Sequence, residues 1–346
     1  MTYPQTTIVL NGKTITIETG HFGAQASGSV TVRCGDTVVI ASCVATNRIK
    51  EGIDYFPLSI EYQEKLYAGG IISSSRFIKR EGRPSEGEIL TGRVIDRSIR
   101  PLFDQSSRNE VQIMVSPLSY DGVEEPEILG IIAASAAISI SDYPWEGPVG
   151  AVRIGMTPEG EYLVNPTVEQ KAVSPMDLVV SGPKGGICMV EAGANEVSEE
   201  KMTGALKFAQ EYVDTIADAI AKFVKEHGKE KRVIAPVEID PEIKKFVAAE
   251  IGDIEELLKN EATKTGTQFS GVISAICTAH PEYNPSHIAE TADHMLREVA
   301  RKNIIEKGHR PDGREIEEIR PINIEVGVLP RTHGSAFFQR GLTHVL

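Results

Sequence analysis

The first 45 residues alternate between apolar and polar side chains, and this period of two is typical of β-strands. Asn11-Gly12 and Gly35-Asp36 interrupt the alternation with residues that favour tight turns. We therefore predict an antiparallel meander in this part of the chain. Strand patterns return further along, at 53–62, 111–118, 149–154, 161–164, 177–182 and 187–191.

Helical patterns lie between and after these strands. The apolar run 127–141 predicts a buried helix, and a longer helix is expected over 198–227. From 241 to 307 the pattern is wholly helical, with breaks at Pro281 and Pro285. Because the strands come in groups, the order indicates an α+β fold and not a regular β-α alternation.

A further helix is predicted to begin at Glu86, because Ser85 and Glu88 have the spacing of a capping box. Pro101 should end it. At about 100° per residue, three arginines share one face and three apolar residues share the other, namely Arg93, Arg97 and Arg100 against Ile95, Ile99 and Leu102.

The segment 76–101 differs in charge from the rest of the chain. It has seven basic and four acidic side chains, whereas the whole chain carries a net charge of −13. This opposition favours a local anion site. Phe77 stands among Arg76, Lys79, Arg80 and Arg83, and single-stranded nucleic acid needs such a surface, because bases stack on the ring while phosphates meet the cations.

The alternative for the helix is a solvated face on which the arginines pair with Asp96 and Glu88.

The chain also contains an incomplete repeat. ITIETGHFGAQASGSVTVRCGDTVVI (15–40) matches INIEVGVLPRTHGSAFFQRGLTHVL (322–346) with a one-residue offset. The strand pattern is still running at Leu346, so we predict one whole domain, a connector and the first strands of a second copy.

Four motifs carry a resemblance to a known family: RFIKREGRPSEGEILTGRVIDRSIRPLF (76–103), DLVVSGPKGGICMVEAGANEVSEEKM (177–202), GHRPDGREIEEIRPI (308–322) and HGSAFFQRGLTHVL (333–346). In this order they resemble the bacterial polynucleotide phosphorylases, over all 346 residues. The resemblance implies a ribonuclease PH-like domain of mixed and antiparallel sheet with helices at 1–235, an all-helical connector at 236–308 and the truncated start of a second such domain at 309–346.

The resemblance also implies a phosphorolytic 3′-to-5′ exoribonuclease, a polyribonucleotide nucleotidyltransferase that releases nucleoside 5′-diphosphates and can run in reverse. Inorganic phosphate would be the co-substrate and Mg²⁺ the cofactor. Single-stranded RNA would be the substrate, within a homotrimeric ring and an RNA-degradation complex. The family's catalytic and metal-binding residues lie in the second domain, so we expect none in this chain, which alone should be inactive.

The RNA-binding residues implied by the resemblance are Phe77, Lys79, Arg80 and Arg83 in the loop and Arg93, Arg97 and Arg100 on the helix. One departure concerns stacking. The family's loop commonly has two consecutive aromatics, whereas Ile78 follows Phe77 here. The preceding IISSS (71–75) also differs from the family's usual Gly/Pro-containing stretch.

Composition is that of an ordinary water-soluble protein, with 41% hydrophobic and 25% charged residues. The apolar run 128–140 is shorter than the roughly 20 residues that a membrane helix needs. Neither a signal-peptide pattern nor a C-x-x-C pair occurs. We therefore expect a cytoplasmic protein without membrane association.

Other candidate sites are weaker. His280, His287 and His294 recur every seven residues, but prolines disrupt the helix that would align them, so surface or partly buried histidines are favoured over a metal site. GPKGG (182–186) lacks the spacing of a phosphate loop and predicts a hairpin turn. Asp312-Gly313 also predicts a turn, with a phosphate contact by Arg314 left open.

Two other classes of function remain as alternatives to a part of an exoribonuclease. One is a non-catalytic, RNA-binding subunit of an exosome-like ring. The other is an enzyme that uses the arginines to bind a mononucleotide or phosphate metabolite.

Overall fold

The computed structural model describes residues 2–49, 53, 55–72, 82–234, 240–263 and 267–346. The chain divides into two compact units, Met1–Val237 and Glu238–Leu346. Their fold is mixed α and β, as predicted.

Six strands form the first sheet of unit 1: β1 Gln5–Leu10, β2 Lys13–Thr19, β3 Gly28–Cys34, β4 Thr37–Ile49, β5 Leu58–Tyr62 and β6 Asn109–Ser119. Their spatial order is β1-β2-β3-β4-β6-β5. Neighbours run antiparallel, apart from β5 and β6, which are parallel. The predicted meander is confirmed, and its turn residues Asn11, Gly12 and Gly35 have φ angles of 48°, 81° and 60°.

Four antiparallel strands form the second sheet, in the order β10-β9-β7-β8: β7 Val149–Met156, β8 Tyr162–Val164, β9 Met176–Pro183 and β10 Met189–Ala194. These are the strands that the alternation predicted. The periodicity gave no signal for two short elements, the helix α3 Val168–Val173 and the 3₁₀ turn Leu66–Gly69.

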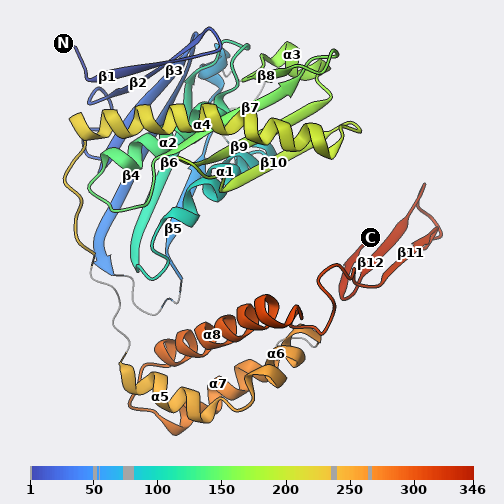
Figure 1. Ribbon diagram of the computed structural model, residues 1–346. Helices are drawn as coiled ribbons and strands as arrows, with labels where there is room; N and C mark the ends of the chain where they lie inside the picture. The colour runs from blue at the N-terminus through green and yellow to red at the C-terminus, as the bar shows by residue number, and fades with distance from the viewer. Residues whose placement is uncertain (1, 50–52, 54, 73–81, 235–239, 264–266) are drawn as a thin grey trace. The chain divides into compact units, whose positions relative to one another are not determined.

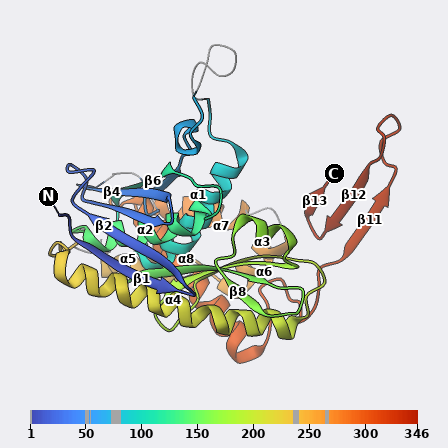
Figure 2. The ribbon, with the colours of Figure 1, turned by 90° about the horizontal axis from the view of Figure 1, so that it is seen from above.

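Three longer helices complete unit 1: α1 Glu86–Ile99, α2 Pro126–Ile140 and α4 Glu199–His227. Helix α2 contacts β3, β4 and β6 of the first sheet, β7 of the second sheet, and α4. Helix α4 lies across β7 and β9, as Figures 1 and 2 show. Every residue of α2 from Ile128 to Ile140 is buried, so the apolar run forms the centre of the core.

Two glycines allow the layers to approach α2 and α4 closely. A Cβ on Gly28 of β3 would lie 2.2 Å from the carbonyl oxygen of Ala137 in α2. A Cβ on Gly150 of β7 would lie 2.2 Å from the carbonyl oxygen of Val213 in α4. Any other residue at either position would force strand and helix apart.

Unit 2 begins with four helices: α5 Pro241–Glu250, α6 Ile254–Thr263, α7 Thr267–Ala279 and α8 Pro285–Lys302, followed by a π-helical turn at Asn303–Lys307. Their core includes Ile243, Val247, Ile276 and Ile288. Of the predicted breaks, Pro281 lies between α7 and α8, and Pro285 is the first residue of α8.

Three further strands form a small antiparallel sheet: β11 Ile322–Val326, β12 Ala336–Arg340 and β13 Thr343–Val345. Its register repeats that of β2, β3 and β4. Glu18 pairs with Thr31 in the first copy, and the matching residues Glu325 and Phe337 pair in the second. The similarity of the two sequences therefore reflects the same three-stranded structure.

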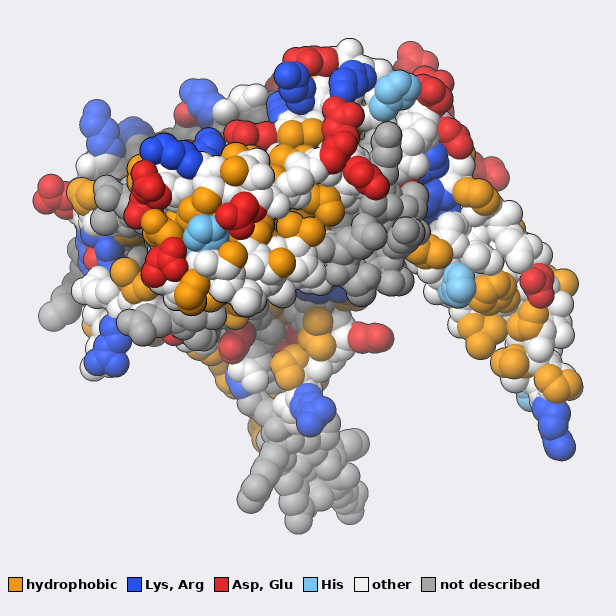
Figure 3. All heavy atoms as spheres, turned by 90° about the horizontal axis from the view of Figure 1, so that it is seen from below, with side chains coloured by type: hydrophobic (Ala, Val, Ile, Leu, Met, Phe, Trp, Pro, Cys, Tyr) orange, Lys and Arg blue, Asp and Glu red, His pale blue; other side chains and the backbone are white. Residues whose placement is uncertain are grey.

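The two copies differ in burial. Ile15 and Ile17 are 1% and 0% exposed in unit 1, whereas the matching Ile322 and Ile324 are 52% and 62% exposed. Figure 3 shows hydrophobic side chains gathered on this small sheet. Each isoleucine gains roughly 1.5–3 kcal/mol on full burial, so this face of the sheet forgoes a stabilisation that the first copy has.

Asp121 fastens the loop before α2 to the turn between β3 and β4. Its carboxylate accepts hydrogen bonds from the Thr37 hydroxyl at 2.9 Å and from the amides of Val123 and Glu124 at 2.8 and 2.9 Å. Partial burial raises the pKa of Asp121, but these bonds outweigh that effect and lower the pKa to about 2. The loop therefore depends on an ionised carboxylate.

We predict that Asp121→Asn lowers the free energy of unfolding at pH 6 by about 1 kcal/mol, allowing for solvent screening. Because the folded pKa lies below the ordinary value of 3.8, the stabilisation is present above that pH and is lost as the pH falls toward 2. Denaturant unfolding of wild type and variant should therefore converge below pH 4. A constant difference from pH 6 to pH 2 would contradict this role.

Candidate nucleic-acid interface

Helix α1 begins as predicted, at a complete capping box. The Ser85 hydroxyl accepts from the Glu88 amide at 3.2 Å, and the Glu88 carboxylate accepts from the Ser85 amide at 2.6 Å. The other oxygen of Glu88 accepts from the amide of Glu64 at 2.7 Å. Glu88 is therefore occupied with backbone groups and fixes the start of α1 to the segment that follows β5.

The two predicted faces of α1 are confirmed within the helix, whereas Leu102 lies in the 3₁₀ turn Arg100–Leu102 that follows and is half-buried. Ile95 and Ile99 are fully buried, whereas Arg93 and Arg97 are exposed. Arg100 is half-buried and caps the helix, which ends before Pro101.

The arginines differ in their partners. Arg100 forms two hydrogen bonds to Asp96, at 2.6 and 2.8 Å, and one to the carbonyl oxygen of Leu58 at 3.0 Å. Arg97 pairs with Glu191 of β10. Arg93 has no ion-pair or hydrogen-bond partner among the described residues. The alternative prediction, in which the arginines of this helix pair with Asp96 and Glu88, is therefore confirmed for Arg100 and Asp96.

The loop residues Phe77, Lys79 and Arg80 lie outside the described residues, so their place in an interface stays a prediction. Arg83 is described and exposed. In the part of the chain that the structure describes, Arg83 and Arg93 are the two cations of this segment without a partner, and their guanidinium groups suit phosphate oxygens.

A cavity of about 720 Å³ lies between the 3₁₀ turn and the first turns of α1, with Arg83, Ser85 and Thr91 in its wall. It has the volume of a small-molecule site. Its charged lining consists of two cations and four carboxylates: Lys65, Arg83, Glu64, Glu88, Glu125 and Glu127. The excess of carboxylates disfavours a phosphate inside the cavity.

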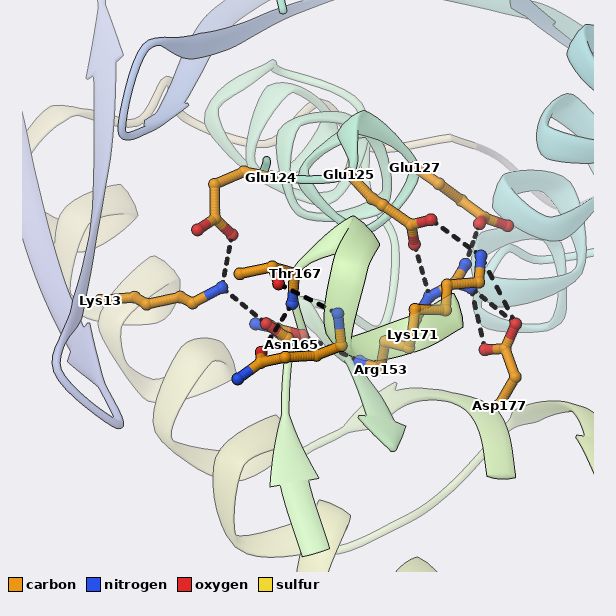
Figure 4. A network of polar contacts seen from close by, with 10 residues as sticks. Lys13, Glu124, Glu125, Glu127, Arg153, Asn165, Thr167, Lys171 and Asp177 are labelled. Carbon is orange, nitrogen blue, oxygen red and sulfur yellow. Dashed lines mark hydrogen bonds and ion pairs between the residues drawn. The ribbon is translucent and has the colours of Figure 1, made fainter. Parts of the chain in front are cut away.

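A buried ion-pair network ties the start of α2 to the second sheet, as Figure 4 shows. Arg153 of β7, whose side chain is only 5% exposed, pairs with Glu125, Glu127 and Asp177. Lys171 contacts Glu125 at 2.8 Å and Asp177 at 3.5 Å. Burial raises the pKa of Glu127, against the opposing effect of Arg153. Sequence reasoning missed this network, because its members are far apart along the chain.

The other candidate sites have structural roles. His280 precedes α8, and its Nε2 lies 2.7 Å from Glu250 and its Nδ1 3.3 Å from Glu282, so it is not aligned with His287 and His294. The hydrogen bond with Glu250 raises the pKa of His280, despite the opposing effect of desolvation.

GPKGG is the predicted hairpin turn, and its Lys184 pairs with Asp218. Arg314 pairs with Asp312 at 2.7 Å. Within the described ranges, no group of three or more His, Cys, Asp or Glu residues is placed so that it could hold a metal ion.

No helix of the described residues is both long enough and apolar enough to span a bilayer.

Comparisons with known proteins agree with this architecture. Residues 11–144 match the family model described as 3′ exoribonuclease family, domain 1, and residues 147–212 match domain 2. The polyribonucleotide nucleotidyltransferase of Heliobacterium modesticaldum is 44% identical over 341 residues, which cover 97% of this chain and 48% of that protein. The protein of the same name from Geobacter sulfurreducens is 43% identical over 351 residues, covering 100% and 50%.

Among solved structures, Rrp46 of rice (Oryza sativa) matches with a TM-score of 0.50 and 12% identity, over 61% of this chain and 94% of that chain, which shows the fold alone. The fold and the matched models define unit 1 as a ribonuclease PH-like α+β domain. The chain belongs to the 3′ exoribonuclease family. It spans about half the length of the curated relatives it matches.

We predict that Arg153→Met destabilises unit 1 by about 3–5 kcal/mol at pH 7, because three carboxylates would lose their shared buried cation. Lowering the pH should relieve part of the loss, since burial raises the pKa of Glu127 and this carboxylate can then be protonated. Denaturant unfolding at pH 7 and pH 5 measures both effects.

Arg153→Lys is the matched control, because it keeps the charge but not the planar fork, and it should lie between wild type and Arg153→Met. Equal stability of Arg153→Met and wild type at both pH values would show that the network makes no net contribution to the free energy of unfolding.

Proposed function

We propose that this chain is the N-terminal part of a phosphorolytic 3′-to-5′ exoribonuclease, a polyribonucleotide nucleotidyltransferase. The observation that carries the proposal is the pair Arg83 and Arg93, the first just before the capped helix α1 and the second on it, because both are exposed and have no partner among the described residues. The identity of 41–44% to proteins named polyribonucleotide nucleotidyltransferase supports it. Single-stranded RNA would be the substrate and inorganic phosphate the co-substrate, with nucleoside 5′-diphosphates as products.

In this proposal the chain guides RNA and does not itself catalyse the reaction. The loop residues Phe77, Lys79, Arg80 and Arg83 bind the strand first, by stacking and phosphate contacts. Arg93 extends the phosphate path along α1, and Arg97 and Arg100 join it only by exchanging their carboxylate partners.

The domain organisation is also a proposal: a ribonuclease PH-like domain at 1–235, a helical connector at 236–308 and the start of a second such domain at 309–346. The common register of β2–β4 and β11–β13 supports it. So does the exposed apolar face of the small sheet, because the matching face in unit 1 is covered.

Catalytic residues and Mg²⁺ ligands would come from the half of the relatives' length that this chain does not span. We also propose a homotrimer and a place in an RNA-degradation complex, on the resemblance of the four motifs alone. The cytoplasmic location that we propose rests on the cysteines, which form no C-x-x-C pair. The second candidate is a non-catalytic, RNA-binding subunit of an exosome-like ring. Such a subunit would use the same residues to bind RNA.

Replacing Lys79, Arg80 and Arg83 together with alanine should weaken binding of a 20-nucleotide oligo(A) and flatten its salt dependence. The slope of log K against log salt should fall by roughly 0.7 for each phosphate that the variant no longer neutralises. Fluorescence anisotropy at 50–300 mM salt gives both quantities.

Lys184→Ala is the matched control, because it removes an exposed cation that already pairs with Asp218 on the α4 side. It should leave the slope unchanged. An unaltered slope in the triple variant would contradict the proposal that Lys79, Arg80 and Arg83 bind the RNA phosphates.

A further inference from the structure

The basic segment 76–101 contains a single aromatic residue, Phe77, which lies outside the described residues. Surfaces that bind single-stranded nucleic acid combine their cations with several rings, because successive bases stack on successive aromatic side chains. A ring supplied by another part of the chain would have to lie beside the start of α1, where Arg83 and Arg93 are exposed.

Tyr67 is an exposed ring in this region. It belongs to the 3₁₀ turn Leu66–Gly69, and 58% of its surface is exposed. Its ring has no aromatic contact and its hydroxyl has no hydrogen-bond partner among the described residues. A lone exposed tyrosine is common on protein surfaces, so its significance depends on how it is held and on what lies beside it.

The 3₁₀ turn holds the backbone of Tyr67 in a fixed position. The amides of Ala68 and Gly70 donate to the carbonyl oxygens of Lys65 and Tyr67, both at 2.9 Å, and the amide of Tyr120 donates to that of Ala68 at 2.8 Å. Gly70 closes the turn with a φ of 70°, a left-handed conformation that glycine adopts at little cost. The backbone that carries the ring is therefore ordered before a ligand binds, which lowers the entropic cost of binding.

The same turn is joined to the start of α1. The amide of Glu64, three residues before Tyr67, donates to the carboxylate of Glu88 in the first turn of α1 at 2.7 Å. The other three residues of the 3₁₀ turn line the cavity of about 720 Å³ together with Arg83, whereas Tyr67 does not. The turn that carries Tyr67 and the segment that carries Arg83 therefore form two walls of one cavity, and Tyr67 lies outside it.

We propose that Tyr67 is a stacking residue of the RNA interface, against which one base of a single strand lies while Arg83 and Arg93 bind neighbouring phosphates. The proposal rests on the proposed RNA-guiding role of this chain and adds a residue outside the basic segment. An exposed ring beside two unpartnered guanidinium groups suits a polyanion with flat bases. A free phosphate would use the guanidinium groups but not the ring.

A second tyrosine provides a comparison. Tyr55 is also 58% exposed, but it precedes β5, whereas Tyr67 follows that strand. Helix α1 packs along β5, as Figure 1 shows, and its C-terminal Arg100 donates to the carbonyl oxygen of Leu58 at the end of β5 that is nearer Tyr55 in sequence. Arg100 is already paired with Asp96. Tyr55 therefore matches Tyr67 in exposure but not in the neighbouring charge on α1.

The test is binding of a 20-nucleotide oligo(A), measured by fluorescence anisotropy at 50–300 mM salt with single variants of this chain. Tyr67→Leu keeps an apolar side chain but has no ring face, so it should bind about tenfold more weakly than wild type. Tyr67→Phe keeps the ring and should bind like wild type. Tyr55→Leu is the matched control and should also bind like wild type.

The salt dependence separates stacking from charge. Stacking neutralises no phosphate, so the slope of log K against log salt in Tyr67→Leu should equal that of wild type, in contrast to the slope in the triple variant of Lys79, Arg80 and Arg83. A flattened slope in Tyr67→Leu would contradict stacking.

Three other results would overturn the role of Tyr67 and leave the proposed function intact, provided that the triple variant is weakened. They are wild-type affinity in Tyr67→Leu, a loss in Tyr67→Phe as large as that in Tyr67→Leu, and equal losses in Tyr67→Leu and Tyr55→Leu. Failure of wild type to bind oligo(A) would overturn the proposed RNA-guiding role and the role of Tyr67 with it.

Discussion

The burial of α2 on every side is the constraint on which unit 1 depends. A helix that is apolar all round is stable only between layers, so it needs a sheet on one side and a second sheet with α4 on the other. Its ends are then fixed by charge. Arg153 and Lys171 hold the carboxylates at its N-terminus, and Lys231 donates to the carbonyl oxygens of Ser139 and Ser141 at its C-terminus, at 2.8 and 2.6 Å.

Helix α1 packs on this framework and carries the charge that distinguishes the chain. Its buried isoleucines set its rotation, and the capping box sets where it begins, so the arginine face has a fixed direction. The partners of Arg97 and Arg100 make much of that face neutral. The local excess of positive charge therefore rests on Arg83, Arg93 and the basic residues that precede them in the sequence.

Local signals in the sequence predicted the elements well, because turns, caps and period depend on neighbouring residues. The capping box at Ser85 and the breaks at Pro281 and Pro285 were found this way. The network around Arg153 and the pairing of Arg97 with Glu191 could not be found, because they join residues on different strands and helices. The repeat was visible in the sequence, but its common register required the structure.

Phosphorolysis is the claim that most needs a direct measurement. The products released from oligo(A) by this chain, and by the same chain extended to its relatives' full length, should be measured with phosphate and Mg²⁺ present. The account predicts ADP from the extended protein, dependent on phosphate, and no product from this chain alone. AMP released without phosphate would indicate hydrolysis and contradict the account, and ADP from this chain alone would place a catalytic site within these 346 residues.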